Sequence, residues 1–355
     1  MRRLSRHIGG TVFNGIFMAL VVFVGLDMVA EIIDEIGALQ RNYRFADALV
    51  YVFTRAPSTI YEYLPNSALI GCIYGLGLLA GNSEVTVMRA SGISLLRIVY
   101  FVIKPVFLFV FLGVIIGEYF SPYLDQRADG TREYLRKGSE VQDSAEGLWI
   151  RENNEFMHFN AVFPGGVLYG VTRYQFGEGK KLEEASFSTR ATYNSLDGEW
   201  TEENVSITRF TDNSTSTEKR ITRQWTSDLS PEVLSVNILP PSSLPIKTLA
   251  NHIAFLQQQG ADIAVYELAY WRKIFQPMVI LGLVLVGVSF VFGPLREATM
   301  GFRVFIGVVI GVSFKTLQDL LGPFSIVYEL PVLYAVIVPI LLCLAVGVFL
   351  LRRNG

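Results

Sequence analysis

Three polar side chains, Lys315, Gln318 and Asp319, lie close together in a stretch of sequence that is otherwise largely apolar. Ionisable groups are costly to place inside a membrane, so they are candidates for a functional role. Lys315 and Asp319 are four residues apart, which places them on one face of a helix where they can pair. Such a pair can carry a proton or ion through a transporter, or it can fasten one helix to its neighbour. Asp27, near the end of another apolar stretch, is a weaker candidate of the same kind.

A second candidate is the short polar loop that contains Glu84 and Arg89. Asn82 or Ser83 can cap the start of a short helix there, and Glu84 in its first turn suits the positive end of the helix dipole. Gly92 can end this helix, because glycine readily adopts the left-handed conformation found after a helix. The loop is either a docking element that offers Glu84 to a basic partner or a plain surface turn, and the local sequence favours neither.

Basic residues gather in two places that follow apolar stretches. Arg41 and Arg44 follow the first stretch, and Arg132, Arg136 and Lys137 follow the third. In a helix, Arg132 and Arg136 lie on one face because they are four residues apart. Long basic side chains near the end of a membrane span usually just extend to water. This cluster can instead bind phosphate or another anionic head group.

The sequence carries no signature of a catalytic or metal-binding site. It has no G-x-x-x-x-G-K-[ST] loop for nucleotide phosphates, no H-E-x-x-H and no G-x-S-x-G, and its histidines are scattered. Cys72 and Cys343 lie in apolar stretches where a thiol simply packs, so we expect no disulfide and no metal framework. A formal charge of −2 gives no reason to expect nucleic acid as a partner.

The composition predicts a membrane protein. Of the 355 residues, 51% are hydrophobic and only 17% are charged, whereas soluble proteins average roughly 25% charged residues. A spanning helix needs about 20 mostly apolar residues. Arg272 and Lys273, beside Trp271, are typical of the interface at the end of such a span. Six stretches are apolar enough to span: 11–33, 57–80, 98–120, 274–292, 304–321 and 331–351.

The distribution of lysine and arginine orients these spans, because short cytoplasmic segments carry an excess of both. The short segments on the side of the two termini hold 10 such residues, whereas the short loops on the opposite side hold 3, Arg41, Arg44 and Arg55. We therefore expect both termini in the cytoplasm. With six spans, the long segment between the third and fourth spans then lies on the outer side.

That long segment, residues 138–245, is expected to be a separate all-β domain. Apolar and polar residues alternate in 148-LWIRENNEFMHFN-160 and 167-VLYGVTRYQF-176, which predicts half-buried strands. Short strands separated by turn residues fit a sandwich or a jelly roll. The expected domains are three spans with a coupling helix at about 82–97 in residues 1–137, the β domain in 138–245, and three further spans in 246–355.

Four blocks of sequence make a family resemblance specific: 81-GNSEVTVMRASGIS-94, 271-WRKIFQP-277, 292-FGPLR-296 and 300-MGFRV-304. With the order of three spans, a β domain and three spans, they resemble the LptF/LptG family, the permease subunits of the lipopolysaccharide export ABC transporter. The resemblance covers the whole chain. The K-I-F-Q-P and F-G-P-L-R blocks are more similar to the LptG branch than to the LptF branch.

The resemblance implies a non-catalytic subunit of the bacterial inner membrane without a cofactor of its own. It implies a heterodimer with LptF, a cytoplasmic LptB ATPase dimer that binds ATP and magnesium, and lateral gates at spans one and five. It also implies that an outer β-jellyroll passes lipopolysaccharide to LptC and the periplasmic LptA bridge. Family members often carry lysines after span one that meet substrate phosphates. The matching stretch, 31-EIIDEIGALQ-40, has none, which places this site in doubt unless Arg41 and Arg44 substitute.

Three functions are compatible with the sequence. The first is a permease that extracts lipopolysaccharide, with Glu84 and Arg89 meeting the ATPase and the basic cluster meeting head-group phosphates. The second is an ion-coupled secondary transporter that uses Lys315 and Asp319; such transporters usually show an inverted repeat, and we find none in the sequence. The third is a membrane-anchored scaffold whose β domain binds a periplasmic partner. The family resemblance favours the first.

Overall fold

The computed structural model describes most of residues 2–354. The residues outside the description are 1, 41, 138–147, 153, 164–165, 178, 180, 196, 212–213, 228, 230, 232–233, 235–239, 259–261, 294–297 and 355. Arg41 of the basic cluster and residues 294–296 of the F-G-P-L-R block therefore lie outside the described residues.

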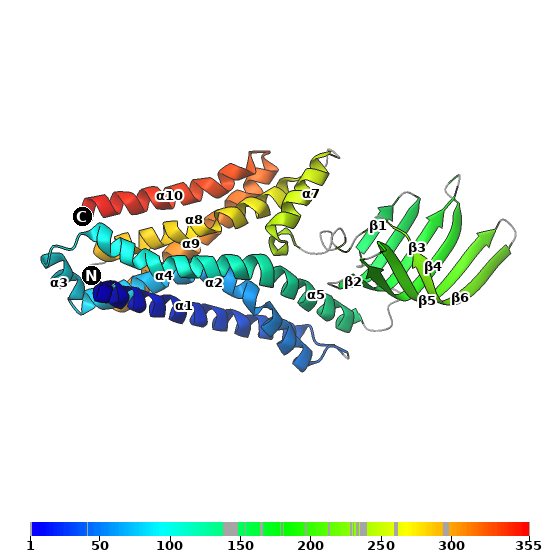
Figure 1. The fold of residues 1–355 in the computed structure, drawn as a ribbon, viewed down its shortest axis with the longest axis horizontal. Coiled ribbons are helices and arrows are strands. Elements are labelled where there is room, and N and C mark those ends of the chain that lie inside the picture. Colours follow the sequence, from blue (N-terminus) through cyan, green and yellow to red (C-terminus); the bar gives the residue numbers. More distant parts are fainter. Residues whose placement is uncertain are drawn as a thin grey trace. The chain divides into compact units, whose positions relative to one another are not determined.

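Six long apolar helices in the described chain are able to cross a membrane (Figure 1). They are α1 (Arg2–Gly37), α2 (Phe45–Gly81), the continuous helix formed by α4 (Leu95–Ile115), η1 (Ile116–Phe120) and α5 (Ser121–Lys137), α8 (Ala264–Phe292), α9 (Met300–Val327) and α10 (Val332–Asn354). Shorter helices with bounds among the described residues include α3 (Glu84–Ala90), η3 (Pro241–Ser243) and α7 (Ile246–Gln258). The predicted helical membrane protein with six spans is confirmed.

The chain divides into two compact units. The helical unit contains Met1–Ala30, Ala56–Ser121 and Pro245–Gly355, and the sheet unit contains Glu31–Arg55 and Pro122–Leu244. The sheet unit is thus larger than the segment 138–245 expected from the sequence. It also takes in the end of α1, the start of α2 and α5 from Pro122 onward, because side chains of these three helices bind one another.

The sheet unit holds one antiparallel sheet whose strands follow the order β1-β2-β3-β4-β5-β6, which confirms the inserted β domain. Its described strands pair only with their neighbours in sequence, whereas a complete jelly roll contains two Greek keys. Gly166, Gly179 and Gly198 have positive φ in the connections, which suits the short turns that join neighbouring strands. The strands are β1 (Leu148–Glu152), β2 (Glu155–Phe163), β3 (Val167–Phe176), β4 (Leu182–Asn194), β5 (Glu199–Thr211) and β6 (Ser214–Trp225).

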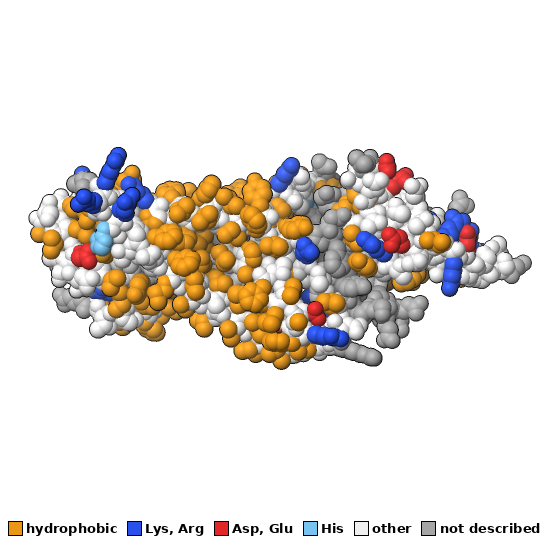
Figure 2. All heavy atoms as spheres, turned by 60° about the horizontal axis from the view of Figure 1, so that its bottom comes forward, with side chains coloured by type: hydrophobic (Ala, Val, Ile, Leu, Met, Phe, Trp, Pro, Cys, Tyr) orange, Lys and Arg blue, Asp and Glu red, His pale blue; other side chains and the backbone are white. Residues whose placement is uncertain are grey.

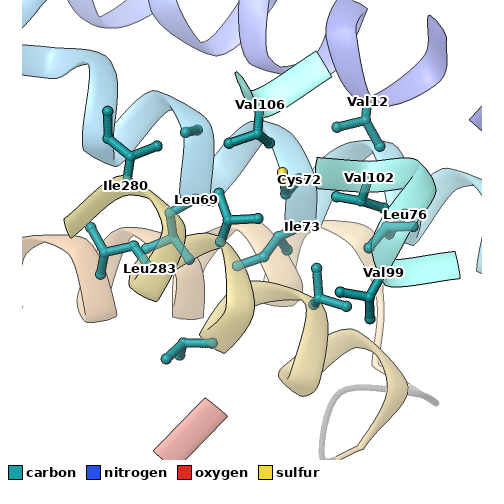
Figure 3. Packing of buried hydrophobic residues seen from close by; sticks show 14 of the residues in the cluster. Val12, Leu69, Cys72, Ile73, Leu76, Val99, Val102, Val106, Ile280 and Leu283 are labelled. Carbon is teal, nitrogen blue, oxygen red and sulfur yellow. The ribbon is translucent and has the colours of Figure 1, made fainter. Parts of the chain in front are cut away.

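Helix α2 lies at the centre of the helical unit. Its side chains Leu69, Cys72, Ile73 and Leu76 are fully buried. Figure 3 shows these four packed together with residues of α1, α4 and α8, namely Val12, Val99, Val102, Val106, Ile280 and Leu283. Cys72 and Cys343 are both free and buried, as the sequence predicts for thiols in apolar stretches.

Glycines let α1 and α9 approach α2 closely. A Cβ atom at Gly71 of α2 would clash with the backbone of Ile16 in α1. On α9, a Cβ atom at Gly311 would lie 2.9 Å from Oδ1 of Asn66 in α2. Small residues at such crossings allow membrane helices to pack by close van der Waals contact. Both outer helices therefore contact α2 through small-residue surfaces.

The helices α1 and α9 are the least buried of the described spans. In the most apolar 18-residue stretch of each helix, 6% of the residues are buried in α1 and 17% in α9, against 67% in α2. Large apolar side chains such as Phe17 on α1 and Phe305 on α9 are exposed. Figure 2 shows hydrophobic side chains over a broad area of the visible face, with lysines and arginines at its margins. Surfaces of this kind suit lipid or another membrane helix as a neighbour.

Candidate functional site

The short helix α3 follows α2 directly and packs one face into the helical unit. Val85 and Met88 are buried in the same hydrophobic cluster as the core of α2. The amide of Gly92 donates to the Arg89 carbonyl and that of Ile93 donates to the Met88 carbonyl, which is the hydrogen-bond pattern of a glycine C-cap. Gly92 thus ends the helix as predicted, although α3 covers only Glu84–Ala90 of the expected 82–97.

The start of α3 differs from the expected side-chain cap. Ser83 has a φ of 59° and its side chain makes no capping hydrogen bond. The left-handed conformation is needed here because α2 ends at Gly81 and the chain turns at once into α3. Glu84 remains in the first turn, where its charge suits the helix dipole.

Glu84 contacts the start of α1. His7 Nε2 lies 2.8 Å from Glu84 Oε2, where it can donate a hydrogen bond to the carboxylate. Both side chains stay partly exposed, so the carboxylate is accessible while it holds α3 to α1. Arg89 is exposed in the last turn of α3. The contact with His7 was not predictable from local sequence, since His7 lies 77 residues from Glu84.

A buried arginine ties α9 to the end of α2. Arg303 Nη1 donates to the carbonyl of Gly77 at 2.8 Å, and Arg303 is almost fully buried. A cation near the C-terminus of α2 also suits the negative end of its dipole. Arg303 lies in the M-G-F-R-V block that supports the family resemblance, but the sequence did not predict its partner. The start of α9 and the start of α1 are therefore both attached near α3.

The polar residues of α9 do not form the pair expected from their spacing. Lys315 forms an ion pair with Glu62 of α2, and its Nζ lies over the Tyr63 ring, 5.8 Å from the centroid. Tyr63 in turn donates to Asp27 of α1 at 2.8 Å. Neighbouring residues of α2 thus connect to α9 on one side and to α1 on the other.

Asp319 contacts α8 instead of Lys315. Its Oδ1 lies 3.7 Å from Nη1 of Arg272, and Arg272 Nη2 donates to the Gln318 carbonyl at 2.6 Å. Gly322 leaves room for the guanidinium, since a Cβ atom there would lie 2.7 Å from Arg272 Nη2. Arg272 thus binds α9, and Lys273 is buried within the protein; the position of these two residues at the membrane interface stays a prediction.

In the sheet unit, Arg132 of α5 binds the end of α1. Its Nη2 lies 2.6 Å from Glu35 Oε1 and its Nε donates to Glu35 Oε2 at 3.0 Å. Tyr43 donates a further hydrogen bond to Glu35 Oε2 at 2.9 Å. Burial and the Glu35 carboxylate raise the pKa of Tyr43 above its usual 10, so the phenol remains a neutral donor. Glu35 and Tyr43 were not anticipated from the sequence.

A second set of contacts lies beside this one. Arg55 Nη1 binds Glu31 of α1 at 2.6 Å and donates to the Tyr51 hydroxyl at 3.0 Å. Tyr51 donates to Asp129 at 3.1 Å, and its ring lies under Arg132, 5.1 Å from the guanidinium carbon. The end of α1 is thus held by arginines from two different helices.

The other members of the predicted basic cluster are less well connected. Arg44 is exposed, and its backbone amide donates to Asp47 Oδ2 at 2.9 Å. Arg136 is partly buried, and its Nε has no hydrogen-bond partner among the described residues. Lys137 is the last residue of α5. The structure brings Arg132 and Arg136 to one helix, as predicted, and Arg132 forms an ion pair with Glu35.

A cavity of about 280 Å³ lies next to Arg132 between α2 and α5. The polar part of its wall comes from Tyr43, Asp47, Tyr51, Thr54, Arg127, Thr131 and Arg132, and the apolar part from Val50, Leu124, Ala128 and Leu135. The two guanidinium groups suit an anionic, oxygen-rich group. In the described residues, no group of three or more histidine, cysteine or acidic side chains is arranged to hold a metal ion.

Comparison with known proteins agrees with these features. Residues 6–353 match the model of the family described as lipopolysaccharide export system permease LptF/LptG. The chain is 31% identical to the lipopolysaccharide export system permease protein LptG of Escherichia coli (strain K12) over 354 residues, which cover 99% of this chain and 98% of that protein. It is 30% identical to LptG of Haemophilus influenzae over 352 residues, with the same coverage.

Proposed function

Because this chain belongs to the LptF/LptG family of lipopolysaccharide export permeases, we propose that it is the LptG-type half of an ATP-driven lipopolysaccharide transporter. It is a multi-pass membrane protein of the lipopolysaccharide export system. In this proposal it pairs with LptF, and a separate LptB ATPase dimer binds ATP and magnesium. This chain then supplies neither a cofactor nor a catalytic group.

The observation that carries the proposal is the geometry of α3. Its apolar face is buried with Val85 and Met88, while Glu84 keeps an accessible carboxylate against His7. A helix anchored in this way transmits a push into the bundle, and an acid on its exposed side suits a basic groove on an ATPase. Arg89 in the last turn provides a second charged contact. Movement of α3 then reaches α1 through His7 and α2 through the chain itself.

The least buried spans supply the path for lipid. The exposed apolar surfaces of α1 and α9 support lateral gates at spans one and five, where these helices meet LptF and the surrounding lipid. Glycine contacts with α2 permit small shifts without opening voids in a core of interlocking side chains. Closure of the ATPase dimer narrows the space between the permeases and expels the lipid outward.

The basic cluster and the sheet receive the substrate. We assign head-group phosphates to Arg132, Arg136 and Lys137, with Arg41 and Arg44 as further cations. The lipid then passes along the β domain to LptC and the periplasmic LptA bridge. The proposed orientation in the inner membrane has both termini in the cytoplasm and the β domain in the periplasm. Cysteine labelling tests it: a reporter at Asp197 should react from the periplasm and one at Ser94 from the cytoplasm, and the reverse pattern would contradict it.

Reconstitution tests the function itself. The chain, copurified with its partners and placed in proteoliposomes loaded with lipopolysaccharide, should release lipid to soluble acceptor protein only when ATP is hydrolysed. Release should be unchanged by a proton ionophore. Release without ATP, or loss of release when the proton gradient is dissipated, would favour the ion-coupled transporter. Nothing in the contacts favours that alternative, because Lys315 and Asp319 bind different helices.

A further inference from the structure

The ion pair between Arg132 and Glu35 has the geometry of an occupied anion site. Two guanidinium nitrogens of Arg132 meet the two carboxylate oxygens of Glu35 at 2.6 and 3.0 Å. The same parallel fork recognises phosphate as readily as carboxylate. Glu35 is only 5% exposed, so its carboxylate is shielded from water and bonds to protein groups. The carboxylate thus occupies the donors that a substrate phosphate needs.

Glu35 also belongs to the gate helix. It lies in the last turn of α1, three residues before Ala38, whose amide donates to the Glu35 carbonyl. Arg132 belongs to α5, the extension of span three. The pair therefore clamps the end of α1 to a different helix, and Tyr43 strengthens the clamp by donating to the same carboxylate.

The neighbouring cavity offers space for a competitor. Arg132 lines it, and Arg127 supplies a second guanidinium, with the carboxylate of Asp47 also in the wall. A phosphate monoester carries more negative charge than a carboxylate and has three strong acceptor oxygens. A phosphate in this cavity can therefore bond to Arg132 and to Arg127, which Glu35 does not use.

We propose that Glu35 is an internal competitor for the substrate phosphate at Arg132, so that head-group binding unclamps the end of α1 from α5. The inference rests on the proposed function, since it assumes that the chain binds a phosphorylated lipid. In the absence of substrate, Glu35 neutralises Arg132 and holds α1 against α5. When a head-group phosphate takes the guanidinium, Glu35 is released from α5, and the end of α1 is then held to α2 by the Arg55–Glu31 pair but can move relative to α5.

Distance measurements between spin labels test the clamp. Labels at Ile33→Cys on α1 and Tyr123→Cys on α5 use exposed positions in the same unit, while the native Cys72 and Cys343 are buried. The complex in nanodiscs is measured alone and with bisphosphorylated lipid A, dephosphorylated lipid A or inorganic phosphate. We expect bisphosphorylated lipid A to lengthen and broaden the distance distribution, and dephosphorylated lipid A to leave it unchanged. A shift with inorganic phosphate as well would show that the phosphate group alone displaces Glu35.

Two variants separate the competitor from its neighbours. Glu35→Gln removes the competing charge at nearly constant size, so the distance should be long without ligand. Its affinity for bisphosphorylated lipid A should rise roughly threefold to tenfold, because the binding-competent fraction is no longer reduced by the clamp. The matched control, Asp34→Asn, removes the same charge from an exposed position on the same turn of α1 and should change neither quantity.

The outcomes distinguish failure of the clamp from failure of the function. If the wild-type complex releases lipopolysaccharide with ATP but bisphosphorylated lipid A leaves the distance unchanged, the clamp is wrong and the function stands. The same holds if Glu35→Gln binds lipid A no more tightly than Asp34→Asn. If the wild-type complex neither binds lipid A nor releases lipopolysaccharide, the proposed function itself is wrong. The wild-type arm decides the matter even if Glu35→Gln does not assemble.

Discussion

The two units of the molecule hold their ion pairs in different ways. In the sheet unit, Glu35 and Glu202 are 5% and 0% exposed, and Glu202 meets both Arg173 at 3.2 Å and Arg223 at 2.7 Å. In the helical unit, the side chains of His7 and Glu84 are 54% and 34% exposed and share a single contact.

This difference separates charged groups that stabilise the fold from charged groups that remain accessible to a partner. A buried carboxylate that loses its partner costs several kcal/mol, whereas an exposed pair contributes little to stability. The buried pairs of Glu35 and Glu202 therefore hold neighbouring elements of the sheet unit together. The partly exposed carboxylate of Glu84 in the helical unit remains accessible to a partner.

The largest effect is expected at Glu202. Glu202→Ala leaves Arg173 and Arg223 without the carboxylate that lies between them in the sheet, and should lower the free energy of unfolding by about 3–5 kcal/mol. Chemical unfolding of the full chain in detergent, followed by tryptophan fluorescence, measures this loss because Trp200 and Trp225 lie in the same core. The control, Glu218→Ala, changes an exposed acid on β6 that pairs with Arg220. Equal effects of the two changes would remove the contrast between buried and exposed pairs.

A much smaller effect is expected when the Lys315–Glu62 pair is removed. Both side chains are about half exposed, so Lys315→Met combined with Glu62→Leu should change the unfolding free energy by less than about 1 kcal/mol. ATP-dependent release should continue in proteoliposomes, since the pair carries no proton in the proposed mechanism. Abolished release with an intact complex would make these residues part of the transport chemistry.

The smallest effect concerns pH and Glu218. A hydrogen bond from Arg220 lowers the pKa of Glu218 below its usual 4.5. A carboxyl group with a lowered folded-state pKa stabilises the fold above the unfolded-state pKa, and this contribution is lost as pH falls through the folded-state value. Stability of the wild type should therefore decrease slightly more than that of Glu218→Gln as the pH falls below 4.5. Parallel unfolding curves for the two proteins at every pH would show that this pair is not coupled to folding.

Local patterns predicted the elements well. Uncharged runs long enough to cross a membrane identified six spans, alternation identified strands, and Gly92 identified the end of α3. Each of these signals comes from residues that are close together in the sequence, within a single helix or strand, where the periodicity of that element applies. The β domain was located, although sequential hairpins replace a Greek-key order among its described strands.

Partners of the charged residues were not predictable in this way. Glu62 lies 253 residues from Lys315, and Glu35 lies 97 residues from Arg132. Spacing within one helix suggested Lys315 with Asp319, but other helices supply closer partners once the bundle is assembled. The partners of Arg303 and Arg272 were not predictable for the same reason, because each partner is a backbone carbonyl group of a helix far away in the sequence.

The central claim is that α3 transmits the work of an ATPase through Glu84, and the ratio of ATP hydrolysed to lipopolysaccharide released tests it most directly. In proteoliposomes containing the whole complex, Glu84→Ala should raise this ratio several-fold or detach the ATPase, because the carboxylate is lost both to the partner and to His7. Glu84→Asp should have an intermediate effect, and Arg3→Gln, at an exposed position on the same end of α1, should match the wild type. A Glu84→Ala complex that retains its ATPase and the wild-type ratio would contradict the account.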